Sequence, residues 1–186
     1  QDVIRFIVCA YHPSNAVLAS DIVPRYMIVA WLLRLTKTLA AAQSAKLALF
    51  YDWLFPPGSM DNIMFVEPGI LLIHHSLTRT PTMAATLLEF LCLIFSEFYP
   101  PFQDNFRGRI VISFRDALQK RVISSLSGIA RHMDKHLTHL FKSKFPEISL
   151  NSGSDSREHN VQETADRAMR QAFEKAQRLA AEVSAA

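Results

Sequence analysis

Apolar residues in this chain gather in runs of helical length, and proline-rich segments separate the runs. One such run is TPTMAATLLEFLCLIFSEFY, residues Thr80–Tyr99. On a helix its polar residues fall in one narrow row, so we expect this helix to be enclosed on most sides. Thr80 can cap its start and Pro81 suits the first helical position. Pro100 ends it, because proline disfavours helical backbone in the residue before it.

An aromatic residue stands just before proline at the end of four apolar stretches. The four sites are Tyr11-His12-Pro13, Phe55-Pro56-Pro57, Phe98-Tyr99-Pro100-Pro101 and Phe145-Pro146. Their last prolines are 44, 44 and 45 residues apart, within the range of about 40–47 residues that two- and three-helix repeats have. Chance spacing of nine prolines is the alternative. The pattern predicts an all-α fold: a right-handed α-solenoid of helical hairpins, HEAT- or armadillo-like, with about three repeats and a C-terminal amphipathic helix.

Helical periodicity fills the stretches between these sites. We expect helices over Asp2–Ala10, Ile22–Thr36, Leu39–Leu54, Pro68–Ser76, Thr80–Tyr99, from Asp104 or Asn105 onward, and over Asp134–Lys144. Lys46 and Asp52 are expected to reach solvent. Asp61 is expected to cap a turn before Pro68 opens its helix, and Gly128 to mark a bend in the third repeat.

The composition changes after Leu150. The segment NSGSDS that follows is typical of a flexible linker. Further on, Asn160 stands three residues before Glu163, a variant of the capping box, and an amphipathic pattern follows it. We therefore divide the chain into a helical-repeat domain (1–149), a linker (150–160) and an amphipathic C-terminal helix (161–186). Packing of this helix on the repeats and its presentation to a partner both stay open.

Composition is that of one globular domain. The chain has 186 residues, 49% of them hydrophobic, and a net charge of +3. We interpret it as a piece of a longer protein. Cys9 and Cys92 lie in apolar runs and are expected to be small buried hydrophobic residues, with one disulfide as the alternative. Neither a membrane span nor a signal peptide is expected.

Candidate catalytic groups are sparse. On one helix, His132, His136 and His139 would share a face at i, i+4 and i+7, which fits either a metal site or a solvated histidine row. A metal-dependent enzyme is therefore one hypothesis. The chain has no nucleophile motif and no phosphate-binding glycine loop, so we expect a non-enzyme without a cofactor.

Basic residues are concentrated between Phe102 and Pro146. This segment holds nine lysines and arginines against three aspartates, a net charge of +6. The bases are Arg107, Arg109, Arg115, Lys120, Arg121, Arg131, Lys135, Lys142 and Lys144. Such a patch can bind a phosphate backbone or an acidic protein surface, and a solvated helical face is the alternative. We take Arg107, Arg109, Arg115, Lys120 and Arg121 as the candidate partner-binding residues.

Several segments together resemble the Integrator complex subunit 3 family, whose members also serve as the scaffold of the SOSS complex. They are DVIRFIV with HPSN, AKLALFYDWLF, EPGILLIHHS, ATLLEFLC, FYPP, QKRV and KFPE, in register from Asp2 to Glu147. AKLALFYDWLF and EPGILLIHHS are specific in combination. The helix predicted after Asn160 departs from the family, and the histidine row is not a family feature.

The resemblance implies an internal piece of a large, non-catalytic helical scaffold in the nucleus. Such a protein serves Integrator in small nuclear RNA processing. In the SOSS complex it holds an OB-fold single-stranded-DNA-binding protein and a small third subunit during the DNA-damage response. Contact with nucleic acid would then be mostly indirect, through the OB-fold partner. A direct nucleic-acid-binding domain that uses the basic third repeat is the alternative.

Overall fold

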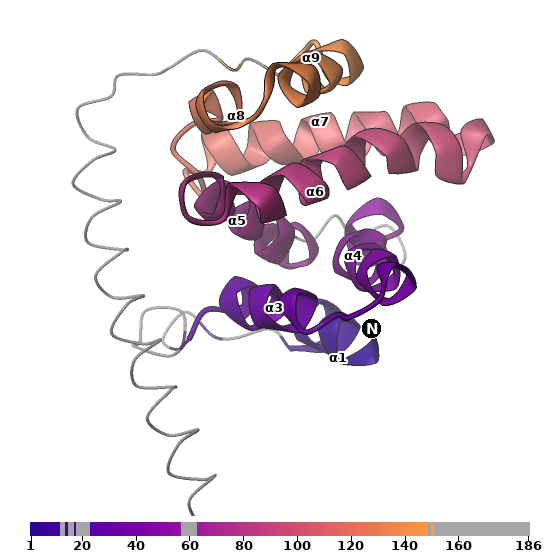
Figure 1. Ribbon diagram of the computed structural model, residues 1–186, viewed down its shortest axis with the longest axis vertical. Helices are drawn as coiled ribbons and strands as arrows, with labels where there is room; N and C mark the ends of the chain where they lie inside the picture. The colour runs from indigo at the N-terminus through magenta and orange to yellow at the C-terminus, as the bar shows by residue number, and fades with distance from the viewer. Residues whose placement is uncertain (12–13, 15–16, 18–22, 57–62, 149, 151–186) are drawn as a thin grey trace, which may run out of the picture. The chain divides into compact units, whose positions relative to one another are not determined.

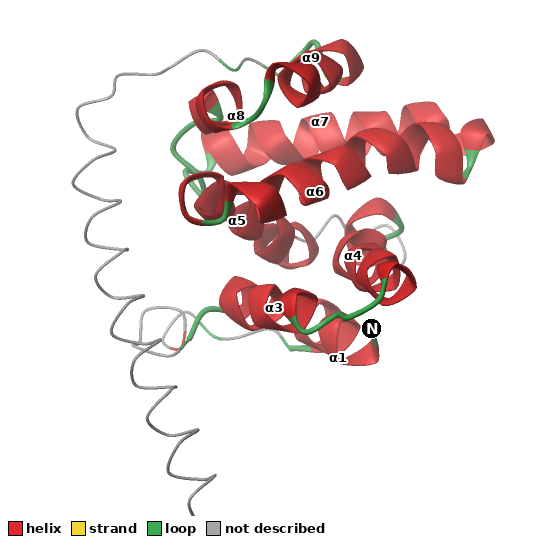
Figure 2. Cartoon of the chain, viewed as in Figure 1, coloured by secondary structure: helices red, strands yellow, loops and turns green. Residues whose placement is uncertain are grey.

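The computed structural model describes residues 1–11, 14, 17, 23–56, 63–148 and 150. Within those ranges the chain is helical and has no strand, so the predicted all-α class is confirmed (Figure 2). The elements are α1 (Asp2–Arg5), the π-helical η1 (Phe6–Ala10), α3 (Arg25–Arg34), α4 (Leu39–Leu54), α5 (Ile63–Arg79), α6 (Pro81–Leu93), the π-helical η2 (Ile94–Phe98), the 3-10 helix η3 (Pro100–Phe102), α7 (Gln103–Gln119), α8 (Ser127–His132) and α9 (Lys135–Lys144). None of these helices is long and apolar enough to cross a bilayer. The predicted Asp61 cap, the linker after Leu150 and the 161–186 helix lie outside the described residues.

Helix α5 is the central element of the described part. It contacts α3 and α4 on one side and α6, α7 and α8 on the other, and in Figure 1 it lies between α3 and α8. Gly69 lets it approach α4, since a Cβ there would lie 3.1 Å from Phe50 and 3.3 Å from Trp53. Aromatic contacts continue from Trp53 to Phe114 of α7 and from Phe114 to Phe141 of α9, each pair at 6.0 Å between ring centroids.

The aromatic residues before the prolines end helices, as predicted. Tyr11, Phe55, Tyr99 and Phe145 are the C-cap residues of η1, α4, η2 and α9. Three of them directly precede proline, and their ψ angles are 67°, 86° and 61° instead of helical values. The proline ring clashes with a helical backbone in the preceding residue, so each helix ends there.

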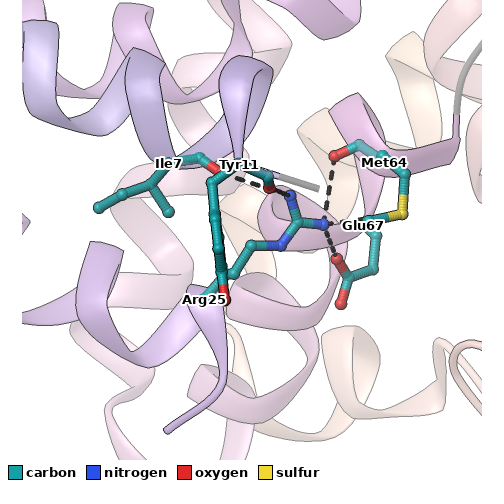
Figure 3. Close-up of polar contacts among 5 residues, drawn as sticks. All are labelled: Ile7, Tyr11, Arg25, Met64 and Glu67. Atoms are coloured by element: carbon teal, nitrogen blue, oxygen red, sulfur yellow. Dashed lines mark hydrogen bonds and ion pairs between the residues drawn. The ribbon is translucent and has the colours of Figure 1, made fainter. Parts of the chain in front are cut away.

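Pro68 does not open a helix, and this prediction was wrong. Helix α5 begins at Ile63 and continues through Pro68. Proline has no N–H, so it leaves the carbonyl of Met64, four residues earlier, without its helical donor. The guanidinium of the buried Arg25 replaces that donor, with Nη2 3.4 Å from the Met64 oxygen (Figure 3).

Arg25 satisfies several acceptors at once. Its Nη2 also donates to the carboxylate of Glu67, and its Nη1 donates to the carbonyls of Ile7 at 3.3 Å and Tyr11 at 3.0 Å (Figure 3). The side chain is only 4% exposed. A buried charge is stable when it is paired and hydrogen-bonded, so Arg25 joins η1, α3 and α5.

Asp52 does not reach solvent, which corrects a second prediction. Its side chain is 3% exposed and pairs with Arg5 of α1 at 2.8 Å. Lys46 is half-buried, with its ammonium 5.4 Å from the centre of the Phe90 ring. Burial lowers the pKa of Lys46, and the charge of Glu89 opposes that shift.

Helix α7 ends at Gln119 with Lys120 as its C-cap, so the break lies earlier than the bend that was predicted at Gly128. Arg121 has a φ of 56°, in the left-handed region. The amide of Val122 donates to the carbonyl of Ala117 at 2.8 Å, and the amide of Arg121 donates to that of Leu118 at 3.1 Å. These two bonds form a Schellman motif, which ends α7. Gly128 lies in the first turn of α8, where a Cβ would stand 3.0 Å from Leu77.

Helix α6 is exposed along one row, and its other residues after Thr82 are buried or half-buried. Thr80 holds the N-cap position and Pro81 the first helical position, but the Thr80 hydroxyl makes no cap bond. The exposed row runs through Thr82, Thr86, Glu89, Leu93 and Glu97. This is the predicted polar row with an apolar residue, Leu93, inside it.

Candidate partner-binding surface

The five candidate cations lie on and just after α7, and the structure does not bring them together as one patch. The core face of this helix is formed by Phe106, Ile110, Val111, Phe114 and Ala117. Because a helix places successive residues about 100° apart, the cations fall on different sides of that face.

Arg107 joins α7 to the end of α9. Its Nε donates to the carbonyl of Lys144 at 3.0 Å, and its Nη2 pairs with Glu147. The hydrogen bond from Arg107 lowers the pKa of Glu147, and the charge of Arg115 contributes to the same shift. Arg107 therefore has a structural role, whereas Arg115 is exposed beside this pair.

Arg109 and Lys120 line a small cleft on the other side of α7. The cleft has a volume of about 100 Å³ and is also lined by Asp52 and Asp116. Lys120 pairs with Asp116 at 3.0 Å, and both side chains are partly exposed. Trp53 forms another wall, where its indole N–H donates to Ser113 at 2.8 Å. Carboxylates thus accompany both cations, which weakens the field that this side presents to an anion.

Arg121 is exposed at the turn after α7. A left-handed conformation costs a residue with a side chain about 1–2 kcal/mol relative to its usual backbone. Glycine is the common residue at this position of a Schellman motif, so the arginine is held there at an energetic cost. The Schellman motif that ends α7 accounts for this conformation, and the role of Arg121 in partner binding stays a prediction.

The three histidines of the possible metal site are not on one helix. His132 ends α8, whereas His136 and His139 lie in α9 after the extended residue Met133. In the described ranges no three histidine, cysteine or acidic side chains are arranged to hold a metal ion. Both cysteines are free thiols, and burial raises the pKa of Cys92 to about 12.

A larger hollow lies between α4 and α6, and the sequence analysis did not identify it. We call it the α4–α6 groove; its volume is about 530 Å³. It is lined by Gln43, Ser44, Lys46, Leu47, Glu89, Phe90, Leu93, Ile94, Glu97 and Phe98. One signal could have revealed it, because Leu93 interrupts a row of polar residues at helical spacing.

Comparison with known proteins identifies the family. Residues 1–143 match the family described as Integrator complex subunit 3 N-terminal. The chain belongs to the Integrator complex subunit 3 family. Over 149 residues, 79% of the chain, it is 45% identical to Integrator complex subunit 3 of Mus musculus and of Homo sapiens. It is 44% identical over 151 residues to the Integrator complex subunit 3 homolog of Anopheles gambiae.

This chain spans only a small part of its relatives. The matched region is 14% of the length of these three proteins. The family match and the 45% identity confirm the resemblance inferred from the sequence segments. The family match ends at residue 143, before the predicted linker, so the 161–186 segment lies outside it.

Proposed function

We propose that the chain is part of a non-catalytic scaffold subunit that works in the nucleus, in assemblies of the Integrator and SOSS type. The observation that carries the proposal is 45% identity over 149 residues to Integrator complex subunit 3. The partners would be other Integrator subunits, an OB-fold single-stranded-DNA-binding protein and a small third SOSS subunit.

Helical repeats suit such a role, because each repeat buries its face on its neighbours and leaves long surfaces for partners. In the right-handed solenoid that we propose, α3 and α4 form one repeat, α5 and α6 the next, and α7 to α9 a third. Contacts of α5 with both α3 and α4, and of α6 with α9, agree with this order. The evenly spaced C-cap aromatics support it as well. Residues 1–149 would form this domain, 150–160 a linker and 161–186 an added helix.

A binding experiment tests the scaffold role. The 186-residue chain is mixed with an OB-fold single-stranded-DNA-binding protein and the small SOSS subunit, and the mass of the complex is measured by light scattering after size exclusion. We expect a stoichiometric complex. Combined Arg115→Glu, Lys120→Glu and Arg121→Glu substitutions should weaken it at least about tenfold if these cations contact the partner. Lys37→Glu, an exposed charge reversal before α4, is the control.

Direct binding of nucleic acid is the second candidate function. Lys135 and Lys142 are exposed on α9 beside His136 and His139, which leaves a helical face without an acidic side chain among the residues of α9. Binding of a single strand through it would weaken steeply with salt: for each phosphate contact, the affinity would fall with about the 0.7 power of the salt concentration. Fluorescence anisotropy of a labelled single strand, titrated with the chain at several salt concentrations, separates the two functions. The scaffold role predicts weak binding without that dependence.

A further inference from the structure

The α4–α6 groove exposes large apolar side chains that the fold does not need to expose. The half-buried Leu47 and Phe90 and the buried Ile94 line its floor and walls, while Leu93 and Phe98 are 37% and 52% exposed. Just beyond it, Tyr99 and Phe102 are 49% and 47% exposed, with ring centroids 5.3 Å apart. A contiguous exposed apolar patch of this kind marks an interaction site more often than a solvated surface.

The wall that α6 provides ends in an unusual turn. Residues Ile94–Phe98 form the π-helical η2, and Ile94 and Phe98 both line the groove. The turn is the last one before Tyr99 and Pro100, so it sets the end of this wall.

The charges on the rim are mostly acidic. Glu89 and Glu97 are exposed, eight residues apart, on the α6–η2 wall. Eight residues correspond to about 12 Å along a helix axis. Lys46, the lysine of the described lining, is turned over the Phe90 ring and half-buried. A complementary ligand therefore carries apolar side chains for the groove and two basic groups for the rim.

The shape and charge of the groove favour a helical ligand. Both walls are helices whose backbone groups bond internally, so an extended peptide would find no strand edge to pair with, whereas a helix brings its own hydrogen bonds. A second copy of the chain, placed with two-fold symmetry, would bring Glu89 and Glu97 against the same carboxylates. We propose that the α4–α6 groove binds an amphipathic helix of a partner protein, whose large apolar side chains fill the groove and whose basic residues pair with Glu89 and Glu97.

The groove proposal goes beyond the scaffold role and involves none of the α7 cations. An experiment can therefore contradict the groove proposal without contradicting the scaffold role, and the reverse. The probe is a synthetic amphipathic helix of about 16 residues with leucines on one face and two lysines about eight positions apart. Binding to the full 186-residue chain is followed by anisotropy and located by methyl NMR. Leu93→Ser and Phe98→Ser should each weaken binding at least about tenfold. Leu35→Ser, which changes a 72% exposed leucine outside the groove, should leave binding unchanged.

A charge exchange gives a sharper result. Combined Glu89→Lys and Glu97→Lys substitutions should weaken binding of the lysine peptide, and a peptide with glutamates in place of the two lysines should bind this variant better than it binds the original chain. The proposal is overturned if the peptide does not bind or if Leu93→Ser leaves binding unchanged. It is also overturned if the chain is a dimer that Leu93→Ser dissociates, or if a peptide with the sequence of residues 160–184 occupies the groove more tightly than the probe.

Discussion

The guanidinium of Arg5 donates to both carboxylate oxygens of Asp52, from Nε to Oδ2 at 3.2 Å and from Nη2 to Oδ1 at 2.8 Å. The carboxylate is 3% exposed, whereas Arg5 is 47% exposed and lies 4.6 Å from the centre of the Tyr51 ring. The hydrogen bond to Asp52 raises the pKa of Arg5. The pair fixes α1 on α4, so α1 is held by a charge interaction as well as by the buried Ile4, and Val8 of η1 is also in the core.

Loss of Arg5 should leave a buried charge without its partner. We expect Arg5→Met to lower the free energy of unfolding by about 2 kcal/mol, below the usual cost of breaking a buried pair because Arg5 is half exposed. Arg5→Met combined with Asp52→Leu should recover part of that loss, since no buried charge remains. Urea unfolding of the two single variants and the double variant measures the coupling. Strict additivity would show that the pair contributes nothing.

Arg25 and Pro68 should be coupled energetically. Arg25→Met leaves buried carbonyls and Glu67 without their donor, and we expect a loss of about 3–5 kcal/mol. Pro68→Ala restores an N–H to the Met64 carbonyl. In that background Arg25→Met should cost about 1 kcal/mol less, the value of one recovered hydrogen bond. Thermal and urea unfolding of the original chain, the two single variants and the double variant give a double-mutant cycle. An equal cost of Arg25→Met in both backgrounds would contradict this account of Pro68.

Two glycines within helices should respond in opposite directions to alanine. At Gly69 the new methyl group meets Phe50 and Trp53, which are 0% and 3% exposed and have no room to move. We expect Gly69→Ala to destabilise the protein by about 1–2 kcal/mol. A Cβ at Gly108 has no neighbour within 4 Å, so Gly108→Ala should stabilise α7 by about 0.5–1 kcal/mol through helix propensity. The melting temperatures of the two variants, measured beside that of the original chain, test both expectations.

The Cys92 thiol should be unreactive and should make stability depend on alkaline pH. Its pKa is about 12 in the folded chain because of burial. The unfolded chain releases this proton near the ordinary thiol pKa, so between about pH 9 and pH 12 the folded state holds more protons and stability falls as pH rises. Cys92→Ala should remove this contribution to the fall of the free energy of unfolding with pH. With a thiol reagent at neutral pH, the half-buried Cys9 should react before Cys92, and equal rates would contradict the assignment.

Local signals predicted much of the fold. The bounds of α4 are those expected from sequence, and three of the four aromatic C-caps, Phe55, Tyr99 and Phe145, follow from the proline directly after them. The helix predicted over Asp134–Lys144 is α9, which begins one residue later because Asp134 is its N-cap and accepts the amide of Leu137 at 2.7 Å. These features depend on residues close together in sequence, which periodicity and capping rules describe.

The wrong predictions concern positions whose burial or helix bounds depend on a residue far away in the sequence. Pro68 lies inside α5 because of Arg25, and Asp52 is buried because of Arg5. The candidate cations are close together in sequence, but Arg107 pairs with Glu147, Lys120 pairs with Asp116 and the helix separates the others, and their role in partner binding stays a prediction. The break at Lys120 was missed because an arginine occupies the left-handed position where glycine would have marked it.

The bonds of Arg25 also determine how the first part of the chain can open. The first turn of α5 depends on a donor from α3, and the same side chain binds carbonyls of Ile7 and Tyr11. If α1, η1 and α3 detached, the Met64 carbonyl would lose the hydrogen bond from Arg25 that replaces the missing N–H of Pro68. The free energy of opening this part alone should therefore be close to that of wider unfolding. We therefore expect the segment to open as one cooperative unit, so that the slowest amides in α1, α3 and α5 exchange with a common free energy.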